Sequence, residues 1–179
     1  MKNRIYFILL FFLFQITKIN SQQKIEHYSI SGKISVDIFS NYYEGIELNA
    51  FGNIYLYSIG YYYGEDYGMF RDKPTENYHQ LNILMGKYEV SKNKKFRFQY
   101  QVGIGAFWGI IRTKVLDESE TNIFIDKYFA KKASTIGFPI KIGGRYIPFK
   151  FISLGIDIQT NINLAKSIIR PMLSVEIEI

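Results

Sequence analysis

The sequence predicts an all-β fold: an eight-stranded antiparallel up-and-down transmembrane β-barrel that follows an N-terminal signal peptide. Three observations lead to this prediction. The composition favours strands, because 15 Tyr and 15 Phe accompany only 4 Pro in 179 residues, and aromatic side chains fit a pleated surface. Apolar and polar residues alternate with a period of two over long stretches. The connectors between these stretches alternate between long and short.

A secretory signal peptide is expected at residues 1–21. Lys2 and Arg4 precede an apolar run at 5–14, and a short polar stretch follows that ends at Ser21. A charged start, an apolar middle and a small residue at the cleavage point are typical of an exported protein. The apolar run is too short for a membrane-spanning helix, which needs about 20 residues. We therefore expect residues 22–179 to form the mature domain.

Charge and Cys content exclude several classes of function. The chain carries 22 Lys and Arg against 16 Asp and Glu, a net charge of +6. Three of these bases, Lys2, Arg4 and Lys18, lie in the expected signal peptide, so 19 bases remain against 16 acids. The remaining bases are scattered among acids, which argues against nucleic-acid binding. The absence of Cys excludes disulfides and thiolate metal sites.

The clearest alternation runs from Phe96 to Arg112. Its even-numbered positions are apolar as far as Ile110, whereas the odd-numbered ones are mostly polar or Gly. A helix would mix these two sets. Similar strands are predicted at 136–145, 152–163 and 169–179, with weaker ones at 33–39, 44–50 and 54–63. The stretch 80–88 is ambiguous, because Leu84 and Tyr88 interrupt its polar face.

The connectors indicate how the strands are arranged. The long segments 64–76 and 114–130 fall at one end of the meander, and the short turns 91–95 and 148–150 fall at the other. Outer-membrane barrels have long external loops and short periplasmic turns. An even strand number also places both termini at the short-turn end. Several strands reach the roughly 9–11 residues that a tilted membrane strand needs.

The polar faces of the predicted strands carry charges of both signs in near balance. These charges are Lys33, Arg97, Lys141, Arg145 and Arg170 against Asp37, Glu47, Asp157, Glu176 and Glu178. In a membrane barrel this face fills the lumen, and eight strands leave no open pore, so the charges must pair with one another. A simple register about residue 149 predicts that Lys141 faces Asp157. The same face carries glycines that would relieve crowding: Gly103, Gly105, Gly109, Gly137, Gly143 and Gly155.

Aromatic residues on the opposite face suit the lipid–water boundary. They are Tyr55, Tyr57, Tyr61, Tyr63, Tyr100, Trp108 and Tyr146. The reverse assignment, a soluble barrel of the lipocalin kind with these rings in its core, stays open.

The chain stops inside an alternating strand, at Leu173, Val175, Ile177 and Ile179. Over residues 30–179 this pattern resembles the small outer-membrane β-barrel proteins of Gram-negative bacteria. In that family the final strand is the signal for the insertion machinery, and it usually ends on Phe, where this chain has Ile179. The resemblance implies a monomer in the cell outer membrane, in contact with outer-membrane lipid and lipopolysaccharide.

Some barrels of this family are lipid-modifying enzymes with a catalytic His near the outer rim. The corresponding candidates here are His79 with Asp66, Glu76 or Asp126, because an imidazole needs a carboxylate to fix its tautomer. A lone His at the rim is usually solvated, and no Ser has a nucleophile-elbow setting. We therefore assign no catalytic residue and do not expect an enzyme.

Neither metal ions nor other cofactors are expected. The acid clusters 65–66 and 117–120 offer oxygen ligands for a hard cation, but they do not match the spacing of an EF-hand. A set of bases flanks the second long connector and could meet lipid phosphates. These bases are Arg112, Lys114, Lys127, Lys131 and Lys132.

The expected function is an outer-membrane scaffold with a structural or adhesive role, presenting the loops 64–76 and 114–130 without an open pore. Two alternatives are a secreted lipocalin-like barrel that binds an apolar ligand and a rim-active lipid-modifying enzyme.

Overall fold

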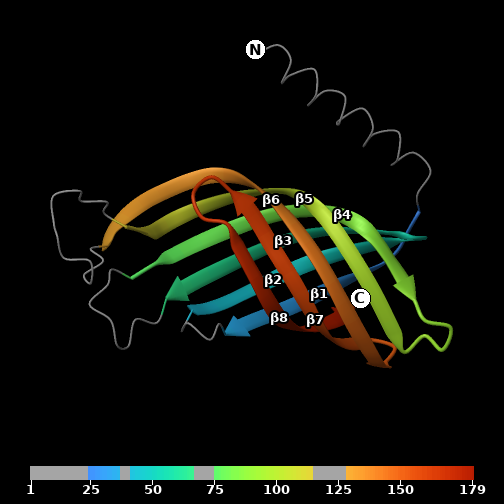
Figure 1. Cartoon of the computed structure of the whole chain (residues 1–179). Helices are drawn as coiled ribbons and strands as arrows, with labels where there is room; N and C mark the ends of the chain where they lie inside the picture. The colour runs from blue at the N-terminus through green and yellow to red at the C-terminus, as the bar shows by residue number, and fades with distance from the viewer. Residues whose placement is uncertain (1–23, 37–40, 67–74, 115–127) are drawn as a thin grey trace, which may run out of the picture.

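The computed structural model describes residues 24–36, 41–66, 75–114 and 128–179. Its strands are β1 (Ile25–Val36), β2 (Asn41–Gly52), β3 (Tyr55–Asp66), β4 (Asn77–Val90), β5 (Phe96–Lys114), β6 (Tyr128–Phe149), β7 (Ile152–Asn163) and β8 (Ile168–Glu178). All pair antiparallel in chain order, and β1 pairs with β8 to close one barrel (Figure 1). The predicted eight-stranded up-and-down barrel is thus confirmed. The described part of the chain contains no helix of the length and apolarity that a bilayer-spanning helix requires.

The strands are staggered as they close. When the pairing partners are followed from Trp108 on β5, the path crosses each of the other seven strands once and returns to β5 at Phe98. The start and the end of this path are thus ten residues apart on the same strand. Such a stagger requires strands that tilt steeply against the barrel axis, as Figure 1 shows. Closure gives every strand of the described barrel a paired neighbour on both sides, as a lipid environment demands, although residues 128–136 of β6 pair only with β5.

The two ends of the barrel differ. One end, here named the turn end, carries the connectors 53–54, 91–95 and 150–151, and both β1 and β8 reach their terminal residues there. The other, the loop end, carries the connectors 37–40, 67–76, 115–127 and 164–167. Both termini of the barrel therefore lie at the short-turn end, as predicted. The two long connectors are shorter than expected, 67–76 and 115–127 instead of 64–76 and 114–130, because β3, β5 and β6 extend into them. Residues 67–74 and 115–127 lie outside the described part of the chain.

The predicted register between β6 and β7 is wrong. Lys141 faces Gln159, and Asp157 faces Gly143. The turn consists of residues 150–151 rather than 148–150, and the register shifts between Tyr146 and Phe149. Pro148 lies inside this irregularity and has no N–H for the ladder. The predicted β6–β7 hairpin, centred on residue 149, was therefore placed one residue too early in the chain.

The alternation along each strand separates a polar interior from an apolar exterior. Ile136 and Ile156, for example, are 71% and 60% exposed, whereas Lys141 is fully buried. The ambiguous strand β4 keeps the same alternation of faces, but its inner face is not wholly polar: Leu84 is buried inside the barrel, and the Tyr88 hydroxyl donates to the carbonyl oxygen of Gly52. His27 lies within β1.

Candidate functional site

The turn-end half of the lumen contains a network of buried ion pairs. Lys33 Nζ lies 2.8 Å from Asp157 Oδ2 and 3.1 Å from Glu47 Oε1. Lys141 Nζ lies 2.5 Å from the same Glu47 oxygen. The side chains of Lys33, Glu47 and Lys141 have no exposed surface. Each buried charge therefore has a partner, which offsets part of the cost of removing it from water.

The network continues towards the turn end through two arginines. Arg145 binds both carboxylate oxygens of Asp157, and its Nε lies 3.4 Å from Glu176. Arg97 lies 2.5 Å from Glu176 and 3.4 Å from Glu178. Eight of the ten predicted luminal charges are thus paired in one continuous network. Of the other two, Asp37 lies outside the described residues.

The tenth charge, Arg170, lies further towards the loop end. Its guanidinium carbon is 4.4 Å from the ring centre of Tyr43 and 5.3 Å from that of Tyr78. These rings belong to a buried apolar cluster, here named the luminal plug. Its residues are Tyr43, Tyr62, Tyr78, Phe107, Ile111, Ile168 and Met172. The Tyr62 hydroxyl donates to Glu47 at 2.6 Å, so the plug and the ion-pair network are in direct contact.

Two further ion pairs lie at the loop-end mouth of the barrel. Lys166 Nζ, in the connector between β7 and β8, lies 2.5 Å from Glu76, which precedes β4. Arg112 of β5 pairs with Asp66 of β3, and its backbone N–H donates to Glu76. In the described part of the barrel, side chains therefore occupy the lumen at three levels, as in other eight-stranded barrels whose interior is filled by side chains.

Inward-facing glycines provide the space for this network. A Cβ on Gly143 would lie 1.9 Å from Asp157 Oδ1, and one on Gly155 would lie 2.4 Å from Arg145 Cδ. On the loop-end side, a Cβ on Gly105 would lie 2.2 Å from Asn82 Oδ1. The predicted role of these glycines in relieving crowding is confirmed at these positions.

The outer face carries an aromatic belt near the loop end, formed by Tyr61, Tyr63, His79 and Trp108. The Tyr61 hydroxyl lies 2.7 Å from His79 Nδ1. The His79 ring stacks on Trp108 with ring centres 5.5 Å apart, and it lies 5.2 Å from the Tyr63 ring. Rings with an apolar body and a polar tip suit the boundary between lipid and water.

The candidate catalytic set does not assemble. His79 lies on the outer face, whereas Asp66 and Glu76 are each 6% exposed and point inwards, where they pair with Arg112 and Lys166. The wall of the barrel separates the imidazole from both carboxylates. Asp126 lies outside the described residues.

The candidate cation ligands also fail to converge. Glu65 accepts a hydrogen bond from Tyr63 on the outer face, whereas Asp66 points into the lumen. The cluster 117–120 lies outside the described residues. In the described ranges, no three His, Cys, Asp or Glu side chains are grouped to hold a metal ion.

The rim bases have different surroundings. Arg112 is engaged with the carboxylates of the barrel mouth. Lys131 and Lys132 of β6 are exposed. The Lys114 side chain and Lys127 lie outside the description.

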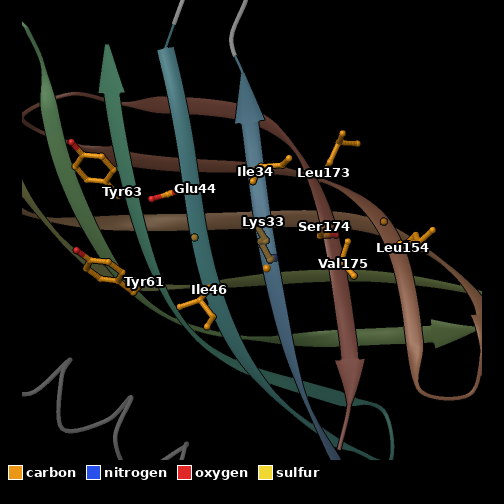
Figure 2. A pocket seen from close by; sticks show the side chains of 13 residues that line it. Lys33, Ile34, Glu44, Ile46, Tyr61, Tyr63, Leu154, Leu173, Ser174 and Val175 are labelled. Atoms are coloured by element: carbon orange, nitrogen blue, oxygen red, sulfur yellow. The ribbon is translucent and has the colours of Figure 1, made fainter. Parts of the chain in front are cut away.

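A groove of about 720 Å³ crosses the outer face over Gly32, a feature that the sequence reading missed. Figure 2 shows its side chains, which come from β1, β2, β3, β7 and β8. A second outer groove, over Gly144, lies towards the turn end and shares Leu154, Gly155 and Leu173 with the first. The sequence feature that could have indicated the first groove is Gly32 itself, because it lies on an otherwise apolar outward face of β1. The glycines singled out from the sequence were those on the inward faces.

A closed eight-stranded barrel with a charged lumen and an apolar exterior defines the class of small membrane-spanning β-barrels. Solved structures of this class are similar to the chain. The N-terminal β-barrel domain of Pseudomonas aeruginosa OprF matches with a TM-score of 0.57 and 12% identity, over 88% of this chain and all of the domain. The Yersinia pestis outer membrane protein Ail, in a phospholipid bilayer nanodisc, matches with a TM-score of 0.53 and 9% identity, over 86% of this chain and 99% of Ail.

At sequence identities this low, the similarity between this chain and the two solved structures extends to the fold alone. No family model matches the sequence, and no curated protein matches it either.

Proposed function

We propose that this chain is an outer-membrane protein whose barrel serves as a membrane-anchored scaffold with a structural or adhesive role. The observation that carries the proposal is the inverted distribution of side chains. Fully buried Lys33, Lys141 and Asp157 line the interior, while large apolar residues cover the outside. This distribution suits a barrel surrounded by lipid and would be unfavourable for one surrounded by water.

The surface that such a scaffold presents is its loop end. The connectors 67–76 and 115–127 are the longest of the barrel, and they leave it at the same end. The expected signal peptide at 1–21 would export the chain, and the termini at the turn end fit insertion with the loop end outward.

The two alternatives receive less support. A soluble carrier needs an apolar cavity, but in the described barrel the lumen holds paired charges and the luminal plug. A rim enzyme needs an oriented base, but His79 contacts aromatic rings, and Asp66 and Glu76 lie across the barrel wall.

Fractionation of cells that express the full chain tests this proposal. The protein should appear in the outer-membrane fraction, and its detergent-extracted band should change mobility on a gel after boiling, because a closed barrel resists unfolding by detergent alone. Recovery in a soluble periplasmic or secreted fraction would contradict the proposal and would point to an apolar ligand instead.

A further inference from the structure

We propose that the turn end of the barrel binds anionic phospholipid through four lysines on two neighbouring turns. These residues, here named the lysine cluster, are Lys92, Lys94 and Lys95 of the β4–β5 turn and Lys150 of the β6–β7 turn. The inference rests on the proposed function, because it requires the barrel to stand in a bilayer. It adds a binding site and a class of ligand at the end opposite the presented loops.

The lysine cluster is exposed and lacks acidic partners. None of its four ammonium groups forms an ion pair with a carboxylate of the described chain. Within residues 87–96 and 147–152 the sequence contains a single acid, Glu89. Four unpaired positive charges close to one carboxylate attract an anionic surface, and each lysine near such a surface adds to the attraction.

The two turns are held side by side by a backbone hydrogen bond. The N–H of Ile147, near the end of β6, donates to the carbonyl oxygen of Lys95 at 2.8 Å. Figure 1 shows both turns at the same end of the barrel, next to each other. The four lysines therefore form one patch rather than two separate groups of charge.

The turn between β4 and β5 supports its lysines on a hydrogen-bonded backbone. The Ser91 N–H donates to the carbonyl oxygen of Phe96, and the Lys94 N–H donates to that of Ser91, both at 2.8 Å. Asn93 Oδ1 accepts hydrogen bonds from the Ser91 hydroxyl and from the Lys95 N–H. A turn that is already ordered loses less conformational freedom when its side chains bind a ligand.

Lys94 has a backbone conformation that is unfavourable for a residue with a side chain. Its φ of 56° lies in the left-handed region, and no other non-glycine residue of the described chain has a positive φ. Gly would adopt this conformation at a lower cost, and Asn is also common there. Residues held in such conformations are concentrated at functional sites. The turn itself gives no reason for a lysine at this position, whereas an anionic ligand does.

Exposed aromatic rings place the lysine cluster at the level of the lipid headgroups. Phe96 and Tyr146 have ring centres 5.4 Å apart, and Phe149 and Phe151, which flank Lys150 in the sequence, stack with ring centres 6.0 Å apart. Such rings form girdles at the boundary between hydrocarbon and water, and a lysine beside them can extend its ammonium group to the phosphates. With the loop end outward, this boundary lies in the inner leaflet, away from lipopolysaccharide, so the ligand is a phospholipid.

The charge of the cluster selects the headgroup. Phosphatidylglycerol carries a net negative charge. In phosphatidylcholine and phosphatidylethanolamine a cation in the headgroup balances the phosphate, and it would repel the lysines. We therefore expect phosphatidylglycerol to be enriched at the turn end.

A tryptophan reporter at the turn end tests the site. Phe149→Trp in a Trp108→Phe background places the only tryptophan next to Lys150 in the sequence. The barrel is folded at low ionic strength into phosphatidylcholine vesicles that contain equal mole fractions of acyl-brominated phosphatidylglycerol or acyl-brominated phosphatidylcholine. The brominated phosphatidylglycerol should quench the reporter more strongly.

Two double variants of the reporter protein assign this preference to the cluster. Lys95→Gln with Lys150→Gln should reduce it by about two- to fivefold, as expected for weak surface ion pairs. Lys131→Gln with Lys132→Gln removes the same charge from exposed positions of β6 at the loop end. This matched control should keep the preference.

Lys94→Gly separates lipid binding from the structure of the turn. The free energy of unfolding in urea should stay equal or rise, because Gly fits the left-handed conformation better. The preference for phosphatidylglycerol should nevertheless fall. A purely structural role of Lys94 would leave the lipid preference unchanged.

Several outcomes would overturn the inference. Equal quenching by the two brominated lipids, or an unchanged preference after Lys95→Gln with Lys150→Gln, would remove the lysine cluster as the site. Loss of the preference in inorganic phosphate, but not in chloride of equal ionic strength, would assign the lysines to a free anion instead. A heat-modifiable barrel with any of these results would contradict the site alone, whereas a band without a heat shift would contradict the proposed function as well.

Discussion

Arg145 and Asp157 form a two-point ion pair inside the barrel, with guanidinium Nη1 and Nη2 each 2.7 Å from a carboxylate oxygen. The two residues are diagonal neighbours on β6 and β7, and each faces a glycine across the ladder: Arg145 faces Gly155, and Asp157 faces Gly143. The missing side chains leave room for the guanidinium and the carboxylate to meet. Lys33 reaches the same carboxylate from β1, so this contact joins β1 to β7 past the intervening strand β8.

Asp157→Asn should destabilise the barrel by about 3–5 kcal/mol, because it leaves the charges of Arg145 and Lys33 buried without their partner. The free energy of unfolding in urea, measured with the protein in lipid vesicles, checks this value. Glu89→Gln, at an exposed position of β4, is the control and should change the stability by less than about 0.5 kcal/mol. A loss as small as that of the control would mean that the network contributes little to stability.

Gly143→Ala and Gly144→Ala should differ sharply although the residues are adjacent. A Cβ on Gly143 would lie 1.9 Å from Asp157 Oδ1, whereas one on Gly144 meets nothing within 4 Å. The first substitution should cost about 1–3 kcal/mol through overpacking, and the second should stay within about 0.5 kcal/mol. The same urea titration measures both, and equal effects would contradict the assigned faces of β6.

Ile156→Arg should strongly disfavour the inserted barrel. Ile156 is 60% exposed on the outer face of β7, and an Arg on the lipid face costs up to about 2–4 kcal/mol near the middle of a bilayer. In a barrel surrounded by water the same exposed substitution would change the stability by only about 0.5 kcal/mol. The fraction of protein that folds into vesicles, read from the heat shift on a gel, separates the two cases.

His79→Ala should leave the membrane lipids unchanged, because His79 contacts Tyr61, Tyr63 and Trp108 rather than a carboxylate. Mass spectrometry of lipids extracted from cells that express either form checks this expectation. A lipid product that is formed with the wild type and lost with His79→Ala would support the rim-active enzyme instead.

The fold could be predicted from the sequence because a strand's period of two is a local property. The faces of β5, for example, follow directly from the order of residues 96–112, and the register shift elsewhere does not alter them. The long connectors could also be predicted, because they are polar stretches without alternation. Their bounds were less accurate, because β3, β5 and β6 extend several residues or less into the expected connectors.

Pairing between particular side chains could not be predicted in the same way. The partner of Asp157 depends on the hairpin register, which the irregularity near Pro148 shifts. The contact between Lys33 and Asp157 depends on strands β1 and β7, which are distant in sequence and are brought together only by closure of the barrel. The groove over Gly32 could not be predicted for the same reason: its walls belong to strands on both sides of the β1–β8 pairing, which only closure of the barrel brings together.

The central claim is that the apolar outer face lies in lipid, and Trp108 reports on it directly. It is the only Trp of the chain, and it lies on the outer face within the aromatic belt. With the mature chain folded into vesicles, we predict that phospholipids brominated on the acyl chain quench Trp108 fluorescence, most strongly when the bromine lies near the headgroup, and that iodide in the water quenches it weakly. Strong quenching by iodide with no effect of the brominated lipids would place the outer face in water and contradict the account.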